Sequence, residues 1–352
     1  MDVPFAKFHG LGNDWLVVGA EGLPRSLSKF VPAILDRHKG VGADGLLVVM
    51  PPRNKKHDAR VRFFNADGSE AEMSGNGIRC AGAFLAELSP ARQSFLIETA
   101  AGLKSLQKVK EEKGKWLFRV GMGAPILEPA KIPFKAGDFP APVKGFPLHT
   151  PRGGVRATVT SMGNPHCSIF VKDFESLNVA PGFSPAGNRV GATLVVARGR
   201  PQGPPLQKAA GYPGSETLRY PLDWESLGRE IETNPLFPNR TNVEFVRVLS
   251  RNEIEVRFWE RGVGHTMSSG TGSCAAAVAS ILNGLTERQV RVRTEAGSLQ
   301  VDWPENGEII LTGPVERIAQ GTYNYSPPRR RRGSGGGGRD PARRPTTPLP
   351  PP

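Results

Sequence analysis

The chain has 352 residues, with 46 Lys and Arg against 33 Asp and Glu, and only three Cys. This length favours two domains, each large enough for its own hydrophobic core. So few Cys exclude a disulfide scaffold and favour a reducing, cytoplasmic setting. Without a long apolar run or a basic-then-apolar start, we expect neither a membrane helix nor a signal peptide.

The net charge of +13 is concentrated in two segments. Residues 327–352 hold seven Arg and one Asp, and residues 182–221 hold four Arg, one Lys and one Glu. Both segments are rich in Gly and Pro, a composition that buries too little apolar surface to offset chain entropy. We therefore expect a long surface insertion at 182–221 and a disordered basic tail at 327–352. We do not expect nucleic acid to be a partner of this tail.

Short β-like runs separated by turn signals dominate the rest of the chain. In chain order they cover residues 15–18, 46–50, 60–64, 95–99, 116–120, 168–171, 242–248, 253–259, 289–294 and 308–313. A short strand is also possible at 190–197 inside the insertion. Helical patterns are few, around 27–37, 80–88 and 274–282. Strands that outnumber helices in this way predict an α+β fold.

An internal repeat at an offset of 195 residues sharpens this prediction. Residues 62–84 (RFFNADGSEAEMSGNGIRCAGAF) align with 257–279 (RFWERGVGHTMSSGTGSCAAAVA). Each copy reads as a strand, a polar loop, the turn SGxG and an Ala-rich helix. Two copies of one such unit predict two similar domains that face each other.

The paired SGxG turns are candidates for holding a small anion. A helix N-terminus carries unpaired N–H groups and partial positive charge. The glycines at 75, 77, 270 and 272 let a ligand approach the backbone closely. The alternative is that Ser74 and Ser269 simply cap their helices.

Other motifs argue against common enzyme classes. Residues 40–45 match GxGxxG, but they precede a strand and open no helix, so we expect no dinucleotide site. The six His are scattered and there is no HExxH or CxxC, so no metal site is predicted. No GxSxG elbow is present either.

Six motifs in order resemble the diaminopimelate epimerase family: KFHGLGNDW, DRHKGVGADG, FNADGSEAEMSGNGIRC, MGNPHC, RTNVEF and WERGVGHTMSSGTGSCAAA. The resemblance implies two pseudo-symmetric domains, each a mostly antiparallel β-sheet wrapped round a central helix, with the active site in the cleft between them. We place the first domain at 1–124, completed by about 312–326, and the second at 125–311. It also implies a homodimer.

The implied reaction inverts one α-carbon of LL-diaminopimelate to give the meso form, for lysine and peptidoglycan synthesis, without pyridoxal phosphate or metal. In this family one thiolate removes the α-proton and a second thiol delivers a proton to the opposite face. The resemblance implies a carboxylate site at Gly75, Asn76, Gly270 and Thr271, with His166 close to the proton-transfer groups. The other implied substrate contacts are Asn13, Asn65, Asn164, Asn242, Glu260 and Arg261.

The chain departs from the family at both catalytic positions, where Ser74 and Ser269 replace the two cysteines. A serine hydroxyl is a far weaker acid than a thiol and needs an adjacent base. Glu70 and His265, at matched places in the two repeats, are candidate bases. Three interpretations stay open: a diaminopimelate epimerase, a racemase, epimerase or dehydratase of another small amino or hydroxy acid, and a non-catalytic amino-acid-binding homologue.

Overall fold

A computed structural model describes residues 1–24, 26–151, 153–174 and 223–326. The predicted insertion at 182–221, the possible strand at 190–197 and the basic tail at 327–352 lie outside these residues. Within the described residues, no helix has the length and apolar character needed to cross a membrane.

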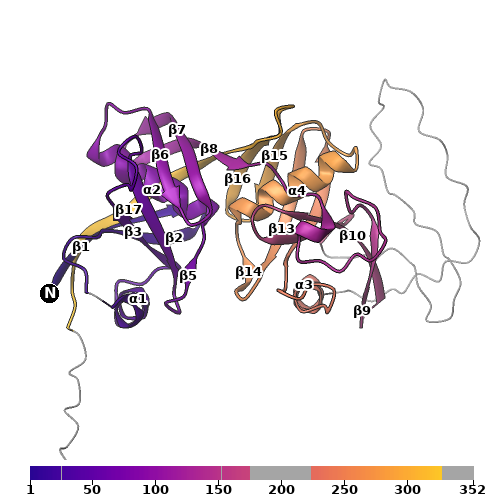
Figure 1. Cartoon of the computed structure of the whole chain (residues 1–352), viewed down its shortest axis with the longest axis horizontal. Helices are drawn as coiled ribbons and strands as arrows, with labels where there is room; N and C mark the ends of the chain where they lie inside the picture. Colours follow the sequence, from indigo (N-terminus) through magenta and orange to yellow (C-terminus); the bar gives the residue numbers. More distant parts are fainter. Residues whose placement is uncertain (25, 152, 175–222, 327–352) are drawn as a thin grey trace, which may run out of the picture.

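The chain forms two halves that lie side by side (Figure 1). In the first half, eight strands pair into a closed ring around helix α2, with parallel pairs only at β2/β3 and β4/β6. The ring strands are β1 (Asp2–Gly10), β2 (Asn13–Gly19), β3 (Gly45–Met50), β4 (Ala59–Asn65), β6 (Ser94–Thr99), β7 (Gly102–Glu112), β8 (Lys115–Gly123) and β17 (Ile309–Asn324). The remaining elements are α1 (Leu27–Leu35), β5 (Glu70–Ala71) and α2 (Gly75–Leu88).

The second half repeats this plan around helix α4 (Gly270–Leu282). Its strands run β9–β10–β11–β12–β13–β15–β16–β17, with parallel pairs at β11/β12 and β13/β15. Their bounds are β9 (Phe146–Thr150), β10 (Gly153–Ser161), β11 (Pro165–Phe170), β12 (Asn242–Ser250), β13 (Glu253–Glu260), β14 (Gly264–Thr266), β15 (Gln289–Thr294) and β16 (Gly297–Asp302). Helix α3 (Trp224–Glu232) and a short 3₁₀ turn (Pro129–Lys131) complete it.

Ten elements of each half follow in the same order, from β1 to β8 and from β10 to β17. The 195-residue offset holds beyond the motif, since β6 begins at Ser94 and β15 at Gln289. The internal repeat therefore extends to the whole half, and the predicted α+β fold with sheets wrapped round a helix is confirmed. We keep the domain boundary at 124/125 as a proposal.

The two central helices fit inside their sheets because their side chains are small. Ala275 to Ala279 of α4 are fully buried. In α2, a Cβ at Gly82 would lie 2.7 Å from the Leu106 side chain of β7. Because these side chains are small, the strands pack closely round each helix on all sides. This packing fixes the direction of the helix N-terminus.

The ten predicted strand runs and three predicted helices are present, but strands β1, β5, β7, β9, β10, β14 and β16 were not predicted. Three further differences concern the helices and β17. Helix α2 begins at Gly75 and α4 at Gly270, so both SGxG turns form the first helical turn. Helix α3 was not predicted. Its buried face is short, and its N-cap Asp223 follows directly on the insertion. Strand β17 runs to Asn324, far past the predicted end at 313, because it pairs with β1.

Candidate active site

Ser74 and Ser269 cap the two central helices. The Ser74 Oγ accepts a hydrogen bond from the N–H of Gly77 at 3.1 Å, and the Ser269 Oγ accepts one from Gly272 at 3.2 Å. A side-chain cap of this kind stabilises a helix by about 1 kcal/mol. The capping interpretation is confirmed for both serines, and it leaves each hydroxyl hydrogen free to be donated.

The two helix N-termini meet at their first residues. A Cβ at Gly75 would lie 2.9 Å from the Gly270 Cα, and a Cβ at Gly270 would lie 2.8 Å from the Gly75 Cα. Only glycine permits this approach of backbone to backbone. The first N–H groups of each helix, at Gly75, Asn76, Gly270 and Thr271, have no acceptor within their own helix. Their partial positive charges add at one point, which suits a carboxylate.

Arg79 lies beneath this junction and is fully buried. Its guanidinium donates to the Gly75 carbonyl at 2.9 Å and to the Asn76 Oδ1 at 2.7 Å. A Cβ at Gly10 or Gly313 would come within 3.1 Å of it, so glycines shape its slot. Burial lowers the pKa of Arg79 to about 10, which leaves it a cation at neutral pH. No ion pair with a carboxylate is present for it in the described chain, so its charge adds to the anion-binding potential above.

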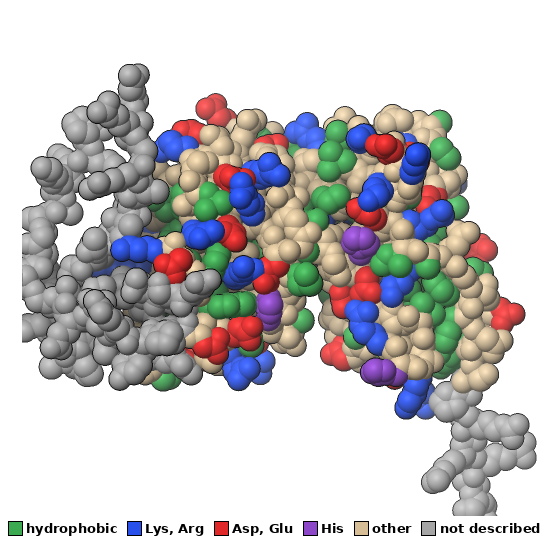
Figure 2. Space-filling model, turned by 180° about the vertical axis from the view of Figure 1, so that it is seen from behind, with side chains coloured by type: hydrophobic (Ala, Val, Ile, Leu, Met, Phe, Trp, Pro, Cys, Tyr) green, Lys and Arg blue, Asp and Glu red, His purple; other side chains and the backbone are tan. Residues whose placement is uncertain are grey.

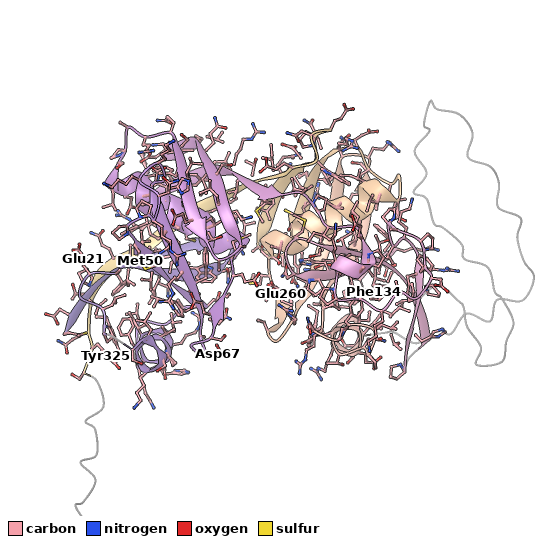
Figure 3. The ribbon with its side chains drawn as sticks, in the orientation of Figure 1. Glu21, Met50, Asp67, Phe134, Glu260 and Tyr325 are labelled. Atoms are coloured by element: carbon pink, nitrogen blue, oxygen red, sulfur yellow. The ribbon has the colours of Figure 1, made fainter. Side chains whose placement is uncertain are left out.

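Glu260, the last residue of β13, lies on the side of the second half that faces the first (Figure 3). Its Oε2 accepts a hydrogen bond from the Ser269 Oγ at 3.1 Å, and its Oε1 accepts one from the Thr266 Oγ1 at 2.6 Å. Desolvation raises the pKa of the Glu260 carboxyl, which makes its carboxylate a stronger base. A serine hydroxyl next to such a carboxylate has the adjacent base that proton transfer requires.

A chain of hydrogen-bonded polar groups runs from Glu244 of β12 through His166 to Asn164. The Glu244 Oε1 lies 2.6 Å from the Nδ1 of His166, and the His166 Nε2 lies 3.0 Å from the Asn164 Oδ1. Desolvation raises the pKa of Glu244. The imidazole is fixed at both nitrogens, so it orients the Asn164 amide.

Asn242 and Arg261 are joined to this group through the backbone. The Asn242 Nδ2 donates to the Pro165 carbonyl at 3.0 Å, and its Oδ1 accepts the N–H of Arg261 at 2.9 Å. The Arg261 side chain is exposed and donates to the Asn239 carbonyl. Asn164, His166, Asn242, Glu260, Arg261 and Ser269 therefore form one connected group in the second half.

Asn13 and Asn65 make their hydrogen bonds within the first half. Asn13 donates to the Asp44 carboxylate at 2.9 Å and accepts from the Trp15 indole. Asn65, the last residue of β4, donates to the Ser69 Oγ at 2.9 Å. Among the described residues, no hydrogen bond joins Asn13 or Asn65 to the second half.

The two bases suggested by sequence point elsewhere. The His265 Nε2 bonds to the Glu295 carboxylate at 2.5 Å, and its Nδ1 lies 3.5 Å from Glu225. Glu70 receives two hydrogen bonds of 2.7 Å from Arg62. Neither contacts the serine that it was expected to activate, because each lies on a short strand whose side chains alternate in direction.

Sequence reasoning missed three residues of this site: Arg79, Glu244 and Thr266. A charged residue inside an apolar helix was the available signal for Arg79. Glu244 lies in an apolar strand and carried the same kind of signal. Thr266 carried none.

The three cysteines are free and fully buried. Burial raises the pKa of Cys80 and of Cys274 to about 12. They remain thiols at neutral pH. Among the described residues, no group of three or more His, Cys, Asp or Glu has the arrangement of a metal site.

Comparison with known proteins gives one consistent family. The family model described as diaminopimelate epimerase matches residues 5–128 and 216–318. The diaminopimelate epimerase of Pelotomaculum thermopropionicum is 40% identical over 91% of this chain and 99% of its own length. That of Halothermothrix orenii is 38% identical over 91% of this chain and 98% of its own length.

Solved structures of low identity share the fold. A predicted epimerase from Pseudomonas aeruginosa superposes with a TM-score of 0.58 at 15% identity, over 92% of this chain and all of that one. A hydroxyproline epimerase from Agrobacterium vitis superposes with a TM-score of 0.57 at 14% identity, over 91% of this chain and 90% of that one.

Proposed function

The chain belongs to the diaminopimelate epimerase family, and on this basis we propose that it binds LL-diaminopimelate and inverts one α-carbon to give the meso form. One observation carries the proposal: two serine-capped helix N-termini meet at Gly75 and Gly270. In this proposal, a single amino-acid carboxylate binds at the junction and a serine hydroxyl lies on either side of its α-carbon. We also propose that the protein forms a homodimer and is located in the cytoplasm.

The junction favours loss of the α-proton. When that proton leaves, negative charge spreads from the α-carbon into the carboxylate. N–H groups already aimed at the carboxylate stabilise this charge without reorganising, and so does the buried Arg79 cation. These groups stabilise the carbanion-like state more strongly than the bound substrate, and such a difference is the requirement for catalysis.

The remaining polar groups suit the distal amino-acid end of the substrate. Asn164 and Asn242 are fixed by hydrogen bonds to His166 and to the backbone. Arg261, exposed beside them, offers a cation for a second carboxylate. Asn13 and Asn65 complete the proposed set of substrate contacts.

The test is conversion of LL-diaminopimelate by the purified full chain, followed by chiral chromatography of the product. We expect slow formation of meso-diaminopimelate, because each missing thiol costs roughly 10²–10⁴ in rate. The matched control is the double variant Ser74→Cys with Ser269→Cys, which we expect to be much faster. Absence of binding and of meso product from both proteins would overturn the proposal, as would turnover of a different amino acid only.

A further inference from the structure

The internal repeat allows the two half-sites to be compared position by position. At the 195-residue offset, Ser74 corresponds to Ser269, and the residue that corresponds to Glu260 is Asn65. The structure agrees, since Glu260 ends β13 and Asn65 ends β4, and both strands hold the same place in their halves. A carboxylate in one half is therefore replaced by an amide in the other.

The Ser269 half-site has a complete route for a proton. The Ser269 Oγ donates to the Glu260 Oε2 at 3.1 Å, and the other oxygen of Glu260 is held by Thr266. Desolvation raises the pKa of this carboxyl above that of an ordinary glutamate. The Glu260 carboxylate is therefore positioned to accept the hydroxyl proton.

The Ser74 half-site has no such route. The Ser74 hydroxyl accepts a hydrogen bond from the Gly77 N–H. The carboxylate of Glu70, the base that the sequence suggested for Ser74, is bound at both oxygens by Arg62. Asn65 donates to Ser69, and an amide takes up no proton at neutral pH. No carboxylate or imidazole of the described residues is hydrogen bonded to Ser74.

We propose that acid–base chemistry in this protein is one-sided: Ser269 and Glu260 remove and return the α-proton on one face, and the Ser74 face has no base. The inference rests on the proposed function. In the step, the Cα–H bond breaks as the Ser269 Oγ takes the proton, and the Ser269 O–H proton passes to the Glu260 Oε2. The electron pair of the C–H bond stays on the substrate and delocalises into its carboxylate. Return of a solvent-exchanged proton by the same path restores the starting isomer, so exchange outruns inversion.

The first experiment compares exchange with inversion in D₂O. The full chain is incubated separately with LL- and meso-diaminopimelate, and deuterium at the α-carbon and stereochemistry are followed by NMR and chiral chromatography. One isomer presents its α-hydrogen to Ser269. For that isomer, we expect the rate of deuterium uptake into uninverted substrate to exceed the rate of epimer formation at least ~10-fold. Equal rates of exchange and inversion in both directions would overturn the inference.

Matched single variants provide the second experiment. Ser74→Cys supplies a thiol where the base is missing, so we expect it to raise the ratio of inversion to exchange at least ~10-fold. Ser269→Cys leaves the Ser74 face deficient and is expected to raise this ratio less. An equal gain from the two substitutions would contradict one-sidedness.

Two further variants test the base itself. Glu260→Gln keeps the shape of the side chain and is expected to lower exchange by about 10²–10⁴ while the thermal transition stays cooperative. Asn65→Asp places a carboxylate at the matched position and is expected to raise inversion relative to exchange. Unchanged exchange in Glu260→Gln would overturn the inference and leave the proposed function standing. Absence of exchange even in the double cysteine variant would overturn both.

Discussion

At the residue scale, the environment of Glu260 sets how the site responds to pH. Desolvation raises its pKa, hydrogen bonds from Thr266 and Ser269 lower it, and the nearby His166 and Glu244 act in opposite directions. The net shift is upward from the ordinary glutamate value of 4.5. Only the ionised carboxylate accepts a proton from Ser269.

This predicts the direction of the pH dependence. Exchange of the α-proton should fall as pH falls through the raised pKa of Glu260, with a midpoint above 4.5. Thr266→Val removes a donor that favours the ionised form, so the midpoint should move to higher pH. The measurement is the initial rate of deuterium uptake against pH for both proteins. A midpoint that does not move in Thr266→Val would show that another group controls the rate.

At the element scale, the contact between α2 and α4 defines the anion site. Each helix is surrounded by its own sheet, so neither can withdraw from the junction independently. The two glycines meet backbone to backbone, where a clash cannot be relieved by turning a flexible side chain. The geometry of the site thus depends on Gly75 and Gly270, which each carry a hydrogen atom where alanine would carry a methyl group.

A single methyl group at the junction should therefore separate the helices. Gly270→Ala is favourable for the helix itself, yet its Cβ would lie 2.8 Å from the Gly75 Cα. We expect a loss of about 1–3 kcal/mol in the free energy of unfolding and at least a tenfold weaker affinity for diaminopimelate. The control is Gly19→Ala, where an added Cβ has no neighbour within 4 Å. Thermal unfolding and calorimetric binding measure the two effects, and wild-type affinity in Gly270→Ala would contradict the proposed carboxylate site.

At the scale of the whole molecule, β17 connects the two halves. It pairs with β16 in the second half and with β8 and β1 in the first. Its end runs beside the N-terminal strand, where Asp2 pairs with Asn324, and the buried Tyr325 packs on Phe30 with ring centroids 5.1 Å apart. The surface is indented between the halves at one edge, and acidic and basic side chains are interspersed over the described part of the face shown (Figure 2).

Truncation should separate the role of β17 from that of the residues after it. A chain that ends at Ser326 keeps the whole of β17, so we expect wild-type melting and exchange. A chain that ends at Val315 leaves β1 without the partners that pair with residues 2–9, so we expect the cooperative transition of the first half to be lost. Circular dichroism melts and the exchange assay measure both. A folded, active protein ending at Val315 would contradict this account of the fold.

Local patterns in the chain were sufficient for the fold class and for much of the site. Alternating runs identified most strands, the repeat at 195 residues identified the two halves, and SGxG identified both helix N-termini, because each depends on residues close together in sequence. The motifs likewise identified the family. Seven strands, helix α3 and the long end of β17 were not identified from these patterns. The end of β17 was missed because it is stabilised by pairing with β1, which is far away in sequence.

Tertiary structure alone decided which base serves which serine. His265 and Glu260 both precede Ser269 by a few residues, and sequence distance favoured His265. The β13–β14 turn brings Glu260 back to Ser269 and directs His265 towards Glu295. The unequal half-sites, the buried Arg79 and the contact of Gly75 with Gly270 likewise arise where distant segments meet. Tertiary packing sets the direction of a side chain and the distance between segments that are far apart in sequence. Neighbouring residues in the sequence do not reveal either one.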